Sequence, residues 1–145
     1  MTLHFQKVHP DAQLPVRATA QSAGADLCAC LDAPVTILPG ETVRIPLGLR
    51  CQPDAGDMAL LIFPRSGLSS KYGITLANAV GVVDTDYRGE WQVPLHNISG
   101  TPFTVEHGMR VAQLVCVPVY IPEILETNCV DDTERGAGGF GSSGI

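Results

Sequence analysis

Short stretches in which apolar and polar residues alternate recur along the whole chain. Residues 3–8 alternate in this way, and within 25–31 the side chains of Asp26, Cys28 and Cys30 share one face. Because successive side chains of a strand point to opposite faces of a sheet, this spacing predicts β-strands. We expect strands at residues 3–8, 25–31, 43–49, 58–63, 74–83, 89–97, 110–119 and 121–126.

Turn-forming residues separate these strands and leave little room for helix. Eleven prolines and fifteen glycines are spread along the chain, with turn clusters at 38–40, 53–56, 84–89 and 99–102. Only residues 66–72 are compatible with a helical turn, with Ser66 as its cap. The pattern predicts an all-β domain, a jelly-roll-like double sheet over residues 1–126, followed by a flexible, glycine-rich C-terminal arm over 127–145.

Composition and charge narrow the possible functions. The 145 residues, 45% of them hydrophobic, suffice for one domain with a substantial core. A net charge of -6 disfavours binding to nucleic acid, but it is compatible with a small anion held by a local arginine cluster and a divalent metal. The N-terminus lacks the apolar core of a signal peptide, and no apolar run approaches the roughly 18 residues of a membrane span. We therefore expect a cytoplasmic protein without membrane contact.

The five cysteines do not indicate a special site. They show no C-x-x-C spacing, so neither a zinc site nor a secreted disulfide framework is predicted. The simplest interpretation of the five cysteines is that they are small side chains buried in the fold.

The last eleven residues combine one cation, one aromatic ring and a backbone rich in glycine. Residues 136–141 satisfy G-x-G-x-x-G, but they do not open a helix within a βαβ unit, and Ser142 stands where a P-loop has lysine. Consecutive N–H groups without side chains can still converge on phosphate oxygens, while Arg135 adds a charged fork and Phe140 covers a planar base. A disordered glycine-serine terminus is the alternative interpretation.

Four further segments contain residues suited to phosphate or base recognition. Residues 64–73 place Arg65, Lys71 and three hydroxyls in one loop, and an ordinary capped turn is the alternative there. Asp84 ends an apolar strand, where it can hold and deprotonate a water or simply shape a turn. Asp26 and Gln113 are polar residues within apolar strands, where each needs a hydrogen-bonding partner. The alternative to a ligand-binding role is that each is hydrogen-bonded only within the fold.

Together, these segments resemble the five motifs of the trimeric dUTP pyrophosphatases (dUTPases). The match runs from residue 23 to residue 144, and all five motifs occur in order with compatible spacing. In this sequence the motifs are Ala23-Gly-Ala-Asp-Leu27, Pro64-Arg-Ser-Gly-Leu68, Gly81-Val-Val-Asp-Thr-Asp-Tyr-Arg-Gly89, Gly108-Met-Arg-Val-Ala-Gln-Leu114 and Arg135-Gly-Ala-Gly-Gly-Phe-Gly-Ser-Ser-Gly144.

The resemblance implies a jelly-roll homotrimer that hydrolyses dUTP to dUMP and pyrophosphate, thereby limiting uracil in DNA and supplying dUMP for dTMP synthesis. The active sites would lie at subunit interfaces, and the arm of one subunit would close the site built by others. Asp84 would activate the water that attacks the α-phosphorus. Mg²⁺ would be held mainly by the triphosphate, with Asp26 supporting it indirectly through water.

The resemblance also assigns the substrate-binding residues. Asn78 would read uracil, Val82 and Val83 would flank its pocket, and Tyr87 would pack under the deoxyribose and exclude a 2'-hydroxyl. The phosphates would be bound by Arg65, Ser66, Gly67 and Gln113, with Arg135 on the γ-phosphate. Phe140 would stack on uracil, Gly141 and Ser142 would donate to phosphates, and Gln92 would complete the pocket.

Two rival functions make different predictions. A dCTP deaminase, which resembles the same fold family, would release ammonia from dCTP, but that family lacks this arrangement around Asp84. A catalytically idle nucleotide-binding regulator would bind dUTP without releasing pyrophosphate.

Overall fold

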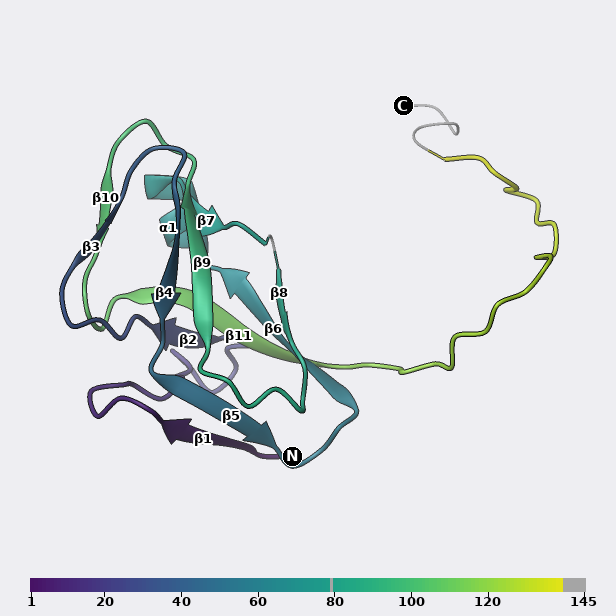
Figure 1. The fold of residues 1–145 in the computed structure, drawn as a ribbon, viewed down its shortest axis with the longest axis horizontal. Coiled ribbons are helices and arrows are strands. Elements are labelled where there is room, and N and C mark those ends of the chain that lie inside the picture. The colour runs from purple at the N-terminus through teal and green to yellow at the C-terminus, as the bar shows by residue number, and fades with distance from the viewer. Residues whose placement is uncertain (79, 140–145) are drawn as a thin grey trace.

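The computed structural model describes residues 1–78 and 80–139. Within them the chain forms eleven strands and one short helix, followed by an extended C-terminal segment (Figure 1). The strands are β1 (Leu3–Lys7), β2 (Ala25–Cys28), β3 (Val35–Ile37), β4 (Thr42–Pro46), β5 (Leu49–Pro53), β6 (Met58–Pro64), β7 (Ile74–Leu76), β8 (Gly81–Val83), β9 (Gln92–Asn97), β10 (Phe103–Val105) and β11 (Arg110–Pro118), and the helix is α1 (Ser66–Tyr72).

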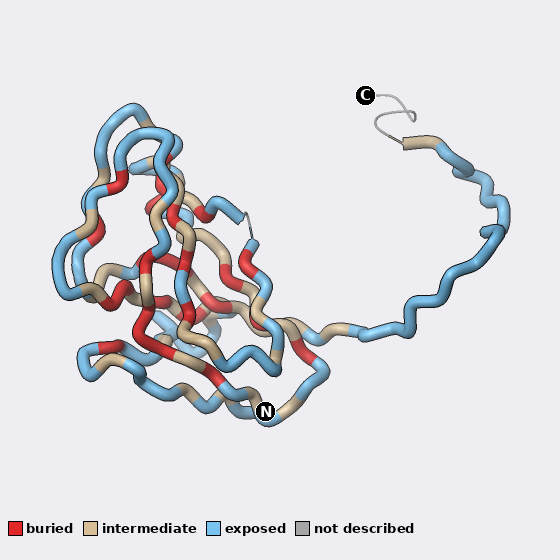
Figure 2. The backbone as a smooth tube through the Cα atoms, viewed as in Figure 1, coloured by how far each residue is buried: buried red, intermediate tan, exposed pale blue. Residues whose placement is uncertain are grey.

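The strands form small antiparallel sheets around one core. The largest has the order β2-β11-β6-β8, a second has β4-β9-β7, and two ribbons pair β1 with β5 and β10 with β3. Figure 2 shows the buried residues gathered inside this body. The predicted all-β, jelly-roll-like double sheet is therefore confirmed.

Alternating burial explains why these segments form strands. In β6, Met58, Leu60 and Ile62 are buried while the residues between them are partly exposed. In β9, Val93, Leu95 and Asn97 are buried in the same way. One face of each strand therefore packs on the core, as a period of two residues predicts.

The buried polar residue Asn97 is fully hydrogen-bonded. Its Nδ2 donates to the carbonyl oxygens of Ile37 (3.0 Å) and Thr101 (2.8 Å). Its Oδ1 accepts from the Ser99 backbone N–H (2.9 Å) and from the Ser99 hydroxyl (2.7 Å). These bonds hold the turn after β9 against β3, which makes Asn97 a structural residue.

Two of the expected strands are each divided in two. The strand expected at 43–49 ends at Pro46, and only Leu49 of it belongs to β5, whose residues 50–53 were not predicted as strand; Gly48 between the two strands is left-handed (φ 65°), a conformation that no regular strand contains. Residues 74–83 contribute to β7 and β8, and Ala77 and Asn78 form a turn directly after β7. The three-residue strands β3 and β10 were not predicted, because such short segments show too few alternations to be recognised.

The predicted helical turn is confirmed, but its predicted cap is wrong. Arg65 occupies the N-cap position without a side-chain hydrogen bond, and Ser66 is the first helical residue. The helix ends at Gly73, which is left-handed (φ 64°) and donates its N–H to the Ser69 carbonyl (3.2 Å). The Ser66 hydroxyl is therefore not used to cap the helix.

The predicted strand at residues 121–126 is also wrong for the single chain. The Val119 N–H donates to the Asp57 carbonyl (3.0 Å), and from there to residue 139 the chain contains no helix or strand. Ile121, Ile124 and Leu125 are 81%, 93% and 74% exposed. Figure 1 shows this segment leaving the body after β11, so it has no partner strand within its own chain. No helix in the described part of the chain is long and apolar enough to span a membrane.

Candidate functional site

A pocket of about 550 Å³ brings together residues from three distant segments. It is formed by the loop before β2, the start of α1, and β11, which lies between β2 and β6 in the sheet. Five predicted site residues line it, namely Asp26, Arg65, Ser66, Gly67 and Gln113. The sheet register explains their meeting, since Gln113 is opposite Asp26 on one side and opposite Phe63 on the other. We call this the phosphate pocket.

Asp26 joins two arginines at the wall of the phosphate pocket. The Arg65 Nε donates to Asp26 Oδ1 at 2.8 Å, and the Arg65 Nη2 donates to Oδ2 at 3.4 Å. The Arg110 Nη1 donates to the same Oδ2 at 3.2 Å. The Asp26 side chain is only 17% exposed, whereas that of Arg110 is 56% exposed. One carboxylate therefore orients two cations, and the cluster retains one net positive charge that attracts an anion.

Arg110 was not singled out from the sequence, although it lies within the fourth motif. Its position follows from strand pairing, because Arg110 is opposite Cys28 at the end of β2. A bulge between Arg110 and Ala112 shifts the register there. Only the pairing of β11 with β2 shows that its guanidinium reaches Asp26.

Gln113 connects β11 to the end of β6. Its Nε2 donates to the Pro64 carbonyl at 2.9 Å, immediately before Arg65. The amide has a second N–H, which can donate to a ligand in the pocket. Gln113 therefore braces the Arg65 segment and keeps one N–H directed at the pocket that it lines.

A smaller pocket of about 120 Å³ lies between β8 and β9. Four predicted residues line it: Asn78, Val82, Val83 and Gln92. The other lining residues are mainly apolar, including Ile62 and Leu76. An apolar slot with two carboxamides suits a planar ring that must be recognised at a polar edge. We call this the base pocket.

An adjoining pocket of about 360 Å³ places Tyr87 beside the base pocket. The two pockets share Ile62, Val83 and Gln92 in their linings. Tyr87 is 48% exposed, and its hydroxyl donates a hydrogen bond to the Glu90 carbonyl oxygen at 3.4 Å. The ring is therefore positioned to cover a group that extends from the base pocket.

Asp84 lies at the end of β8, in the turn that leads to Tyr87. The Tyr87 N–H donates to the Asp84 carbonyl at 3.1 Å, and Arg88 braces the hairpin through the Thr85 and Tyr87 carbonyls (2.7 and 3.1 Å). The Asp84 side chain is exposed and makes no hydrogen bond or ion pair with the described residues. Asp84 lines none of these three pockets in the described part of the chain, but it directly follows Val83, which lines the base pocket, and its carboxylate is free to bind a water molecule.

The phosphate pocket and the base pocket have no lining residue in common. Arg135 joins neither of them, because it lies in the segment that leaves the body, where its Nε donates to the Gly138 carbonyl (2.9 Å). The predicted residues Phe140, Gly141 and Ser142 lie outside the described residues. One chain thus presents two parts of the expected site separately.

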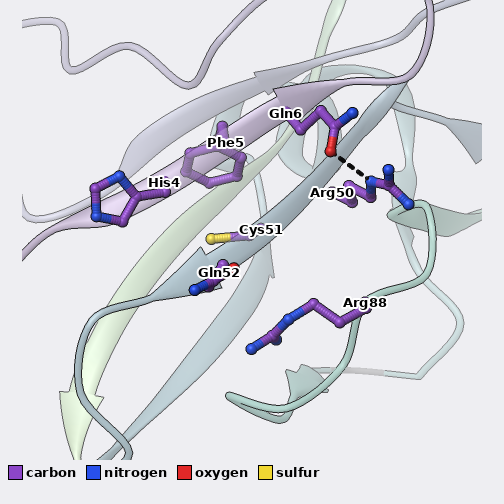
Figure 3. Close-up of a pocket in the computed structure, with 7 residues that line it drawn as sticks. All are labelled: His4, Phe5, Gln6, Arg50, Cys51, Gln52 and Arg88. Carbon is purple, nitrogen blue, oxygen red and sulfur yellow. Dashed lines mark hydrogen bonds between the residues drawn. The ribbon is translucent and has the colours of Figure 1, made fainter.

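Another pocket, of about 370 Å³, lies beside the β1–β5 ribbon (Figure 3). Arg50 Nε donates to Gln6 Oε1 at 2.9 Å along its wall, and Arg88 approaches from the hairpin. Burial raises the pKa of the Cys51 thiol to about 11. Cys51 therefore stays protonated near neutral pH and is unsuited to nucleophilic chemistry. None of the predicted site residues lines this pocket.

No protein-only metal cage is formed by the described residues, among which no three His, Cys, Asp or Glu side chains gather. Asp26 is the acidic residue of the phosphate pocket. Its two oxygens accept three N–H groups, and a carboxylate has about four acceptor positions, so it can also accept from a metal-bound water. The residues present thus fit an indirect role towards a hydrated cation.

Comparison with known proteins gives one consistent family. The dUTPase family model matches residues 10–144. Deoxyuridine 5'-triphosphate nucleotidohydrolase of Desulfitobacterium hafniense (strain DSM 10664 / DCB-2) is 49% identical over 133 residues, covering 92% of this chain and 88% of the relative. The enzyme of the same name from Burkholderia multivorans is 51% identical over 134 residues, covering 90% and 88%. Among solved structures, the Staphylococcus bacteriophage 80alpha dUTPase G164S mutant with dUpNHpp superposes with a TM-score of 0.88 at 26% identity, covering 99% of each chain.

Proposed function

Because the chain belongs to the dUTPase family and is a dUTP hydrolase, we propose that it cleaves dUTP to dUMP and pyrophosphate, with Asp84 as general base. The observation that carries this proposal is an exposed Asp84 carboxylate, without a hydrogen bond or ion pair to the described residues, directly after Val83 of the base pocket. Asp84 takes a proton from a water as that water attacks the α-phosphorus, and pyrophosphate leaves from the opposite side. The dUMP product serves dTMP synthesis, and removal of dUTP limits uracil in DNA.

The phosphate pocket stabilises the charge that develops in this reaction. Arg65 and Arg110 are held by Asp26, so they need little reorganisation when the negative charge shifts towards the leaving group. The free N–H of Gln113, the Ser66 hydroxyl and the backbone at Gly67 supply further donors. Fixed donors in the required positions are the main source of catalysis in phosphoryl transfer.

The base pocket determines which nucleotide is accepted. Asn78 offers both a donor and an acceptor to the polar edge of uracil, while Val82, Val83 and Gln92 enclose the ring. Cytosine presents the reversed donor and acceptor pattern, so it leaves buried polar groups of the pocket unpaired. Thymine is excluded because its methyl group is too large for the base pocket. Tyr87 packs under the deoxyribose.

Mg²⁺ is the metal that this chemistry requires. When bound to the triphosphate it neutralises phosphate charge and orients the phosphate chain. Asp26 orients its two arginines and would accept a hydrogen bond from a water of the hydrated ion. The metal itself would be held mainly by phosphate oxygens of the substrate.

A homotrimer with active sites between subunits joins the separated parts of the site. The base pocket and the phosphate pocket share no lining residue in one chain, which supports a site in which one nucleotide contacts these pockets on two different copies. The β domain expected over residues 1–126 has its last strand at Arg110–Pro118, and the arm, residues 127–145, closes the site of a neighbouring subunit. There Arg135 binds the γ-phosphate, Phe140 stacks on uracil, and Gly141 and Ser142 donate to phosphates. The exposed apolar residues before the arm support contact with another copy.

The decisive assay measures pyrophosphate release from dUTP, dTTP, dCTP and UTP in parallel, with and without Mg²⁺. We expect release from dUTP far above the other three and a strong requirement for Mg²⁺. Ammonia release from dCTP would instead indicate a deaminase, and binding of dUTP without turnover would indicate a regulator.

Replacing Tyr87 with alanine is expected to weaken discrimination against ribose. Without the ring, the 2'-hydroxyl of UTP no longer meets a steric obstacle, so the ratio of kcat/KM for UTP to that for dUTP should rise about tenfold or more. Tyr87→Phe keeps the ring and serves as the control. An unchanged ratio in Tyr87→Ala would remove Tyr87 from sugar selection.

Replacing Asp26 with asparagine is expected to impair both substrate binding and stability. The two guanidiniums lose their shared counter-charge, so KM for dUTP should rise about tenfold and the free energy of unfolding should fall by about 1–3 kcal/mol. Steady-state kinetics and urea unfolding measure the two effects. Asp32→Asn is the control, because the Asp32 side chain is 95% exposed. If excess Mg²⁺ restores the parental KM in Asp26→Asn, Asp26 acts on substrate binding through the metal rather than through the arginines. If Asp26→Asn leaves KM unchanged, Asp26 acts on substrate binding through neither of them.

A further inference from the structure

Three glycines in the motifs each lie directly beneath a side chain that the proposed function assigns to the substrate. None has the positive φ that would by itself require glycine. We propose that they are positioning residues, where the missing Cβ allows a substrate-binding side chain to lie against the backbone in its binding orientation. The pairs are Gly24 with Gln113, Gly81 with Asn78, and Gly89 with Tyr87.

The pair of Gly24 and Gln113 is the clearest case. A Cβ at position 24 would lie 2.5 Å from Gln113 Oε1, 3.3 Å from its Cδ and 3.4 Å from its Cβ. All three atoms belong to the side chain that donates to the Pro64 carbonyl at 2.9 Å. The closest atom is the end of a flexible side chain, so an alanine at position 24 is accommodated by rotating Gln113. The consequence is a displaced carboxamide in the phosphate pocket rather than a disrupted fold.

The pair of Gly89 and Tyr87 repeats this arrangement at the sugar. A Cβ at position 89 would collide with the Tyr87 hydroxyl and would lie 2.5 Å from its Cζ and 3.0 Å from its Cε2. The ring therefore lies across the Gly89 backbone, two residues further along the hairpin. Alanine at position 89 must push the ring away from the place where it excludes a 2'-hydroxyl.

The pair of Gly81 and Asn78 is less specific, because a core side chain lies about as close to position 81 as Asn78 does. A Cβ at position 81 would lie 3.2 Å from Asn78 Nδ2, but it would also lie 3.3 Å from Ile62 Cβ. A substitution there disturbs the core as well as the base pocket. By contrast, a Cβ at Gly100 would meet nothing within 4 Å, so Gly100→Ala is a matched control.

A double-mutant cycle tests the first pair and rests on the proposed role of Gln113 as a phosphate donor. Gly24→Ala, Gln113→Ala, the double variant and Gly100→Ala are compared for KM and kcat with dUTP and for melting temperature. We expect Gly24→Ala and Gln113→Ala each to raise KM about tenfold, the scale of one lost hydrogen bond to a charged group. In the Gln113→Ala background, Gly24→Ala should change KM by less than about twofold, because the side chain that it displaces is gone.

The outcomes separate this inference from the proposed function. If Gly24→Ala raises KM equally in both backgrounds, the added methyl acts on the ligand or the backbone, and the inference is overturned. If Gln113→Ala alone leaves KM unchanged, the assignment of Gln113 to phosphate fails, and the inference at Gly24 fails with it.

The pair of Gly89 and Tyr87 is tested by the selectivity between UTP and dUTP, which a general loss of structure would not change. Gly89→Ala should raise the ratio of kcat/KM for UTP to that for dUTP about tenfold, as Tyr87→Ala does, and should add nothing in the Tyr87→Ala background. An unchanged ratio in Gly89→Ala, with Tyr87→Ala raising it, would overturn the proposal for this pair while leaving the role of Tyr87 intact.

Discussion

Asp84→Asn is expected to lower kcat for dUTP by about 100-fold or more, the scale of general-base catalysis. Asparagine has nearly the same shape as aspartate but cannot take the proton of the attacking water. The carboxylate makes no hydrogen bond or ion pair with the described residues, so the substitution leaves no partner unpaired among them. Affinity for a non-hydrolysable dUTP analogue should therefore change little. Single-turnover kinetics and analogue titration measure the two quantities separately.

Asp86→Asn is the matched control for this prediction. Asp86 is exposed in the same hairpin turn, two residues from Asp84, and it has no predicted part in the chemistry. Its replacement should leave kcat within about threefold of the parent value, because general-base catalysis is lost only at the carboxylate in contact with the water. Near-parental turnover in Asp84→Asn, or an equal loss in Asp86→Asn, would remove Asp84 from the proposed mechanism.

The sequence predicts the strands of the core better than it predicts their ends. Alternation locates β6 and β11 correctly because both pack one face on the core over many residues. It fails at Gly48, where a single left-handed residue separates β4 from β5 without changing the hydrophobic pattern. It also fails at 121–126, where apolar residues have no partner in their own chain. Local pattern reports which residues need burial but not which surface buries them.

The candidate site shows the same difference between local and long-range information. The motifs identify Asp26, Arg65 and Gln113, but their contact depends on β11 lying between β2 and β6. Arg110 was missed because only this pairing brings it to the Asp26 carboxylate. The apparent cap at Ser66 was a misinterpretation of a common local pattern, since the helix begins one residue earlier than a Ser66 cap requires. Residue types therefore indicate the chemistry, while topology determines which of them act together.

Deleting Arg135 to Ile145 is expected to leave the fold and assembly intact while lowering kcat about 100-fold or more, the scale of losing a charged or polar group that stabilises the transition state. The buried core ends at Leu114, residues 120–137 are exposed, and Gly138 and Gly139 are half-buried, so the deletion removes no buried side chain among the described residues. Circular dichroism, light scattering and steady-state kinetics measure fold, assembly and turnover. If the truncated protein instead unfolds or dissociates, the arm is a structural element.

Mixing two inactive variants tests whether the arm acts between subunits. The truncated chain keeps Asp84 but lacks its arm, whereas full-length Asp84→Asn keeps the arm but lacks the base. If each arm closes the site of a neighbour, co-expressed mixed trimers contain sites with both parts, and turnover should recover well above that of either variant alone. Full-length Asp84→Asn mixed with truncated Asp84→Asn is the control and should remain inactive. No recovery in a trimer shown to be mixed would place each arm on its own subunit, because complementation then cannot assemble a complete site.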